Sequence, residues 1–120
     1  MKNEFQDYQV QCTRTAKYKD AACGRLAYVT MGLAGEAGEV ANQVKKVFRD
    51  TNGKLTPEAR EQLIDELGDV LWYVAMVAYE LNIPLHRVAG KNLLKLEKRH
   101  GGNQPQNQSP PPLPDGTASV

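Results

Sequence analysis

Apolar residues recur at helical spacing over most of the first hundred positions, and the pattern begins with two predicted helices. Asn3 followed by Gln6 resembles a capping box, and the apolar residues after it keep a helical period. A second helix is predicted over residues 25–49, where leucines and valines form one stripe. The segment "DTNGKL" at 50–55 is predicted to be a turn or a mobile loop.

Two further helices are predicted in the second half of this region. Thr56 as N-cap and Pro57 at the first helical position open a helix that reaches Leu81. Asn-Ile-Pro at 82–84 breaks it, and a fourth helix follows over 85–99. Because no segment alternates as a strand would, the fold class is all-α, a four-helix bundle-like packing.

The third predicted helix is apolar on nearly all sides between Leu67 and Leu81. Such a helix must be covered from several directions. About a hundred ordered residues bury only a modest core, so one chain is not expected to supply all the cover. We therefore expect a homo-oligomer, either a dimer or a tetramer.

The composition changes at Gly101 and divides the chain into two parts. Residues 1–100 form one predicted domain. Residues 101–120, "GGNQPQNQSPPPLPDGTASV", contain little to bury and are expected to be a disordered tail.

The charge balance and the cysteines narrow the class of protein. With 15 basic and 14 acidic side chains, the chain lacks the positive excess that attracts nucleic acid polymers or membranes. Two cysteines without a CxxC pair make no disulfide framework. The longest apolar run is too short for a membrane span. A cytoplasmic protein is expected.

Two pairs of acids stand beside the apolar stripes of the middle helices. Glu36 and Glu39 are three apart in "GLAGEAGEV", and Glu66 and Asp69 repeat the spacing, with Tyr73 one turn further on. If these helices pack antiparallel, the pairs face one another. Four converging carboxylates would repel and have raised pKa values unless a cation neutralises them. Oxygen ligands select hard ions, so the expected cofactor is Mg²⁺, with Mn²⁺ as a possible substitute.

A site of this kind usually takes up substrate phosphates as well, and these need cations nearby. The fourth predicted helix carries Lys91, Lys95, Lys98 and Arg99 on one flank, with Asn92 at its inner edge. The alternative interpretation is an ordinary solvated face, just as Glu36 and Glu39 alone could be surface acids.

Three segments together resemble a known family. They are "GLAGEAGEVANQVKK", "DELGDVLWYVAMVAYEL" and "GKNLLKLEKRH". They resemble the MazG-like nucleoside triphosphate pyrophosphohydrolases of the all-α NTP pyrophosphatase superfamily, whose signature is E-x-x-E, a spacer, and E-x-x-D. The resemblance covers about residues 4–100.

This resemblance implies Mg²⁺-dependent hydrolysis of a (deoxy)nucleoside triphosphate to the monophosphate and pyrophosphate. It implies that the metal ligands are Glu36, Glu39, Glu66 and Asp69. Glu36 and Glu39 are the catalytic candidates, and Glu39 is favoured for orienting the attacking water because it is furthest from its apolar stripe.

The resemblance also implies residues that hold the nucleotide. The phosphate-binding candidates are Tyr73, Lys91, Asn92, Lys95 and Arg99. Base-binding candidates come from the first helix and the middle of the third, namely Phe5, Tyr8, Gln9 and Trp72 or Tyr73. Two alternatives stay open: a non-catalytic helical oligomerisation module, and the same fold acting as a dUTP or phosphoribosyl-ATP pyrophosphatase.

Overall fold

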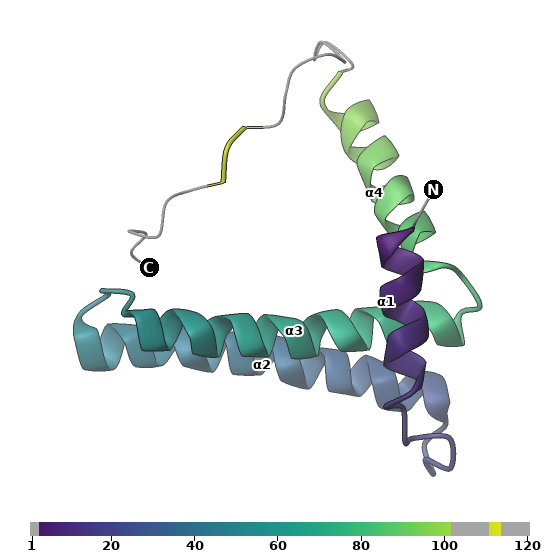
Figure 1. Ribbon diagram of the computed structural model, residues 1–120, viewed down its shortest axis with the longest axis horizontal. Coiled ribbons are helices and arrows are strands. Elements are labelled where there is room, and N and C mark those ends of the chain that lie inside the picture. Colours follow the sequence, from purple (N-terminus) through teal and green to yellow (C-terminus); the bar gives the residue numbers. More distant parts are fainter. Residues whose placement is uncertain (1–2, 102–110, 114–120) are drawn as a thin grey trace.

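The computed structural model describes residues 3–101 and 111–113, and the regular structure in them is helical (Figure 1). The helices are α1 (Glu4–Thr13), α2 (Arg25–Thr51), α3 (Pro57–Glu80) and α4 (Leu85–Arg99). The predicted all-α class is therefore confirmed. The predicted tail lies outside the described residues except for Gly101 and 111–113, which are exposed and without regular structure.

The sequence signals for helix ends are confirmed at atomic level. The Asn3 side chain accepts a hydrogen bond from the Gln6 backbone N–H at 3.2 Å. Thr56 caps α3 in the same way, accepting from the Ala59 N–H at 3.1 Å. Helix α2 runs two residues beyond its predicted end, because the left-handed conformation that stops it is adopted only at Asn52, with φ of 54°.

Helices α2 and α3 form a long antiparallel hairpin, and α1 crosses the end of it that contains the last turns of α3 (Figure 1). The buried core lies at this crossing. Val29 of α2 and Met76 of α3 are fully buried there. Around them lie Cys12, Tyr18, Ala75, Ala78 and Leu85.

Helix α4 departs from the predicted bundle. It contacts α1 and α3 but, within the described residues, makes no contact with α2, and it points away from the hairpin (Figure 1). Leu85 at its start is buried, whereas Leu93 is 67% exposed. The turn before α4, where Asn82 is left-handed with φ of 57°, directs the helix outward. One chain therefore does not close four helices around a common core.

The connection between α1 and α2 is anchored by Tyr18. Its hydroxyl donates to Glu80 Oε1 at 2.9 Å, and Arg25 lies 3.5 Å from the other carboxylate oxygen of Glu80. The Tyr18 ring stacks on Tyr28 at 5.3 Å and meets the edge of Trp72 at 6.3 Å between ring centroids. Burial, assisted by the bond to Glu80, raises the pKa of Tyr18 above its ordinary value.

We expect Tyr18→Phe to lower the free energy of unfolding by about 1.5–3 kcal/mol near neutral pH, since it removes a hydrogen bond to a charged group. A raised folded-state pKa means that the Tyr18 contribution is complete below about pH 10 and is lost as the pH rises above it. Urea unfolding between about pH 8 and about pH 11 should show a steeper alkaline loss in the wild type than in Tyr18→Phe. Equal slopes would contradict the assignment.

Within the described residues, no helix combines the length and apolarity needed to cross a bilayer.

Candidate metal centre

Three carboxylates from the two hairpin helices converge on one point. Glu36 comes from α2, and Glu66 and Asp69 come from α3. One carboxylate oxygen of each lies within 4.8 Å of the others. The antiparallel packing of α2 on α3 brings them together, because each helix presents its acids on the flank beside the shared apolar seam.

Glu39, the fourth acid, is exposed and stands outside this group of three. It still acts on the group through its charge. Partial burial, followed by repulsion from Asp69, Glu66 and Glu39, raises the pKa of Glu36 above its ordinary value. The site is thus a focus of negative charge, as the sequence suggested.

The donor set fits a hard divalent cation. Only oxygen ligands are present, and two of the three acids, Glu36 and Glu66, are partly buried while Asp69 is exposed. Mg²⁺ bound by a few carboxylates keeps several waters and has room for phosphate oxygens. The raised pKa of Glu36 indicates that its negative charge is not compensated by neighbouring protein groups.

Tyr73 packs between the two helices next to these acids. A Cβ atom at Gly32 would overlap the Tyr73 ring, so only glycine allows α2 to come this close to α3. Burial, then the proximity of Tyr28, Glu36 and Asp69, raises the pKa of Tyr73. Tyr73 therefore lies within electrostatic range of Glu36 and Asp69, and its contact with a nucleotide stays a prediction.

Tyr8 reaches the same region from α1. Burial raises the pKa of Tyr8 to about 12, with smaller contributions from the neighbouring Cys12 and from Asp69. Tyr8, a base-binding candidate of the first helix, therefore lies close enough to Asp69, a metal-ligand candidate, for the Asp69 charge to affect it.

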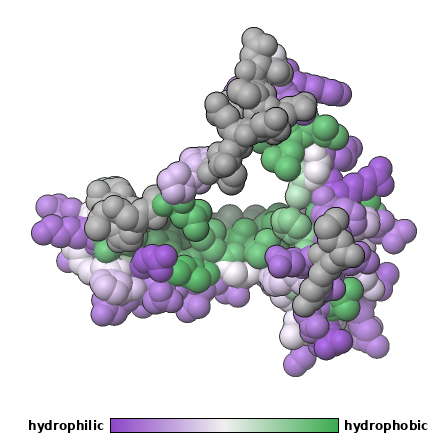
Figure 2. Space-filling model, turned by 45° about the horizontal axis from the view of Figure 1, so that its top comes forward, coloured by the Kyte–Doolittle hydropathy of each residue, from purple (hydrophilic) through white to green (hydrophobic). Residues whose placement is uncertain are grey.

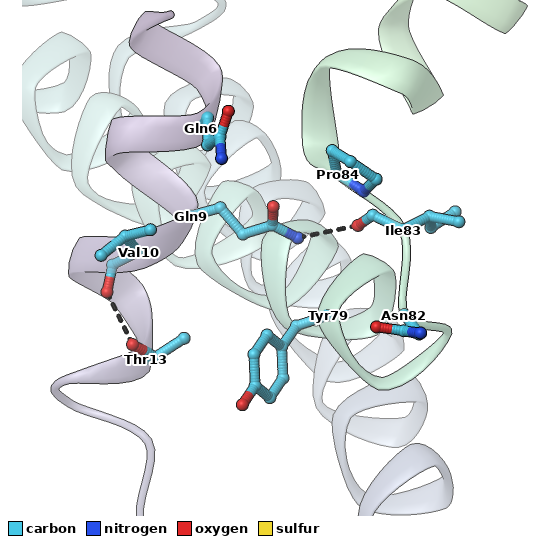
Figure 3. Close-up of a pocket in the computed structure, with 8 residues that line it drawn as sticks. All are labelled: Gln6, Gln9, Val10, Thr13, Tyr79, Asn82, Ile83 and Pro84. Atoms are coloured by element: carbon cyan, nitrogen blue, oxygen red, sulfur yellow. Dashed lines mark hydrogen bonds between the residues drawn. The ribbon is translucent and has the colours of Figure 1, made fainter.

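Gln9, the residue after Tyr8, forms hydrogen bonds within the protein. Its side-chain amide donates to the carbonyls of Ala75 at 3.3 Å and Ile83 at 3.1 Å, and its oxygen accepts from the Leu85 N–H at 3.1 Å. Figure 3 shows the Ile83 bond beside a cavity of about 300 Å³, which is lined by Gln6, Gln9, Val10, Thr13, Tyr79, Asn82, Ile83 and Pro84. Both Gln9 donors are used, so base recognition by Gln9 stays a prediction that requires these bonds to break.

The other aromatic base-binding candidates, Trp72 and Phe5, differ in their surroundings. The Trp72 indole N–H donates to Thr15 Oγ1 at 2.9 Å, and its ring meets the edge of Tyr73 at 4.9 Å. Phe5 is 49% exposed on α1.

The cations of α4 are not brought next to the carboxylates. Two cavities lie along this helix, of about 550 Å³ and 430 Å³. The first is lined by Ile83, Arg87, Val88, Lys91, Asn92 and Lys95, and the second by Lys91, Leu94, Lys95, Lys98 and Arg99. Phosphate binding by Lys91, Asn92, Lys95 and Arg99 stays a prediction.

Sequence reasoning missed two residues that shape the site, Gly32 and Tyr28. Gly32 precedes Glu36 by one turn on the same flank of α2, and Tyr28 precedes Gly32 by another. The four-residue spacing could have indicated both, but the close approach of Tyr73 is a tertiary contact without a local signal.

Comparisons with known proteins show the family to which this chain belongs. The model of the MazG nucleotide pyrophosphohydrolase domain matches residues 26–102, a span that includes the three converging acids. The chain is 51% identical over 96 residues to the Gene 37 protein of Mycobacterium phage L5. The aligned region covers 77% of this chain and 84% of the phage protein. No solved structure matches. The family model covers more than half of the sequence, and the chain therefore belongs to the MazG nucleotide pyrophosphohydrolase family.

Proposed function

We propose that the protein hydrolyses (deoxy)nucleoside triphosphates to the nucleoside monophosphate and pyrophosphate with Mg²⁺ as cofactor. The observation that carries the proposal is the convergence of Glu36, Glu66 and Asp69 within 4.8 Å, in a chain of the MazG family.

In this proposal Glu36, Glu66 and Asp69 hold the metal, and Glu39 is near enough to add its charge while staying exposed. Bound Mg²⁺ would polarise the phosphoryl oxygens and make water a better nucleophile. Glu39 would orient that water and accept its proton. The water oxygen then bonds to phosphorus as a phosphoanhydride bond breaks and pyrophosphate leaves.

The proposal also assigns the nucleotide ligands. Tyr8 and Tyr73 lie within electrostatic range of the acids and would contact the nucleotide beside the metal. Lys91, Asn92, Lys95 and Arg99 would neutralise the remaining phosphate charge, which requires α4 of the same or of another chain to approach the acids.

The test is pyrophosphate release from a panel of standard and damaged (d)NTPs, with dUTP and phosphoribosyl-ATP included. We expect release with Mg²⁺ or Mn²⁺ and its loss when EDTA removes the metal, because the acids alone cannot bind an anionic triphosphate. Adding Mg²⁺ back in excess should restore the rate. Absence of release from every substrate would favour a non-catalytic oligomerisation module.

The exposed apolar residues favour self-association, and we propose a homo-oligomer, dimer or tetramer. Ile64, Leu67 and Leu71 form a stripe on α3 that is 43–56% exposed, and Leu93 and Leu94 on α4 are 67% and 59% exposed. Figure 2 shows hydrophobic surface over both the hairpin and α4. A second copy of the chain would cover these faces with matching apolar surface.

Sedimentation at micromolar concentration should give a mass above that of one chain. Leu67→Lys should shift the distribution toward monomer, because it places a charge in the apolar stripe. Glu61→Lys, a change at an exposed position six residues before Leu67 on α3, serves as control. A monodisperse wild-type monomer would contradict the proposal.

We also propose that the protein is cytoplasmic. Its two cysteines, Cys12 and Cys23, are both free thiols, and a reducing compartment keeps thiols in that state.

A further inference from the structure

Tyr28 has an aromatic ring close to the acidic site, and the proposed hydrolysis assigns it no role. Its ring stacks on Tyr18 with an interplanar angle of 15°, yet 42% of the residue is exposed. Tyr18 beneath it is buried and fixed by the hydrogen bond to Glu80 and by the Trp72 edge. Tyr28 is therefore a half-exposed ring on a rigid support.

The flank of α2 that joins this ring to the carboxylates is open at Gly35. Residues 28, 32, 35 and 39 follow one another at helical spacing and share one flank of the helix. The two middle positions are glycines: Gly32 is covered by the Tyr73 ring, whereas a Cβ at Gly35 would meet nothing within 4 Å, so the open strip of this flank lies at Gly35. Eight residues separate Tyr28 from Glu36, which is about 12 Å along the axis. The sugar and phosphates of a nucleotide can bridge that span.

We propose that Tyr28 is the platform on which the nucleobase stacks, with the sugar and phosphates passing over Gly35 and the phosphates ending at the metal site. The inference rests on the proposed function and defines its substrate class. Stacking uses the π-face that every base has and reads no hydrogen-bonding edge. Because the Gln9 amide and the Trp72 N–H are already bonded, base discrimination should be weak, and purine and pyrimidine triphosphates should both bind.

The test measures the contribution of the base to the binding affinity separately from that of the phosphates. Calorimetry in Mg²⁺ would measure the affinity of the full-length protein for two probes, a non-hydrolysable α,β-methylene deoxynucleoside triphosphate and inorganic tripolyphosphate. We expect Tyr28→Ala to weaken nucleotide binding by about tenfold to a hundredfold while tripolyphosphate affinity is kept. Tyr28→Phe, which retains the ring, should restore the nucleotide affinity.

Three outcomes would overturn the inference: equal losses for both probes, no loss for the nucleotide, or failure of Tyr28→Phe to restore binding. If the wild-type protein binds neither probe, the proposed function itself fails, and this result is distinct from the other three.

A second variant tests the path of the phosphates and does not depend on the aromatic cluster. Gly35→Leu fills the open strip, and the fold should tolerate it because leucine is a better helix former than glycine. We expect nucleotide affinity to fall at least about tenfold with no loss of thermal stability. Ala41→Leu, an exposed position on another flank of α2, should bind like the wild type. Unchanged affinity in Gly35→Leu would overturn the proposed path.

Discussion

Asp69→Asn will lower kcat/KM for pyrophosphate release by about a thousandfold. The change keeps the size of the side chain but removes one of the three charges that meet within 4.8 Å. Losing a metal ligand costs several kcal/mol of transition-state stabilisation, and each 1.4 kcal/mol corresponds to a factor of about ten. Steady-state kinetics at saturating Mg²⁺ would measure the loss.

The same variant should be more stable than the wild type when no metal is present, because the acids repel one another and Asp69 contributes to the raised pKa of Glu36. Thermal unfolding with EDTA should therefore show a higher Tm for Asp69→Asn. Added Mg²⁺ should raise the Tm of the wild type much more than that of the variant.

Glu61→Gln provides the control for both measurements, since Glu61 is an exposed acid of α3 that pairs with Arg60 at 3.3 Å and stands outside the group of three carboxylates. It should leave turnover and the response to Mg²⁺ unchanged. Full turnover in Asp69→Asn would refute the metal assignment, whatever its effect on stability.

Gly32→Ala will destabilise the protein and impair the site together. Alanine normally stabilises a helix interior relative to glycine by about 0.5–1 kcal/mol. Here its Cβ would overlap the Tyr73 ring, so we expect a loss of about 1–3 kcal/mol from overpacking. The ring must move or the helices must separate, and either change displaces the acids. Urea unfolding and pyrophosphate release would report the two effects.

Gly38→Ala is the matched control, six residues further along the same helix. Its Cβ meets nothing within 4 Å, so it should stabilise the protein by about 0.5–1 kcal/mol. Combining Gly32→Ala with Tyr73→Leu should recover part of the lost stability, because the smaller side chain leaves space for the new methyl group. Strictly additive effects in this double-mutant cycle would show that the two positions do not clash.

The helices and the facing acids could be predicted from the sequence because their causes are local. Thr56 and Pro57 begin α3 through the capping bond and the fixed proline φ, whatever packs on the helix later. Glu36 and Glu66 face one another because both helices follow the same period and a short turn makes them antiparallel.

The arrangement of α4 could not be predicted in the same way. Its stripe of leucines indicates a buried face but does not say which surface covers it, so the sequence does not fix where α4 lies relative to the other helices. The direction of α4 depends on the turn at Asn82 and on contacts with α1. Likewise, the spacing that grouped Glu39 with Glu36 does not distinguish the exposed acid from the one in the cluster.

The three hydrogen bonds of Gln9 have a consequence for the order in which the protein assembles. They connect the first helix to residues 66 to 76 positions later in the chain. A ten-residue helix is marginal by itself in water, so α1 cannot be secured during synthesis until the segment around Leu85 has left the ribosome. The N-terminal helix should thus dock late, and Tyr8 should reach the region of the three acids only when nearly the whole domain has been made.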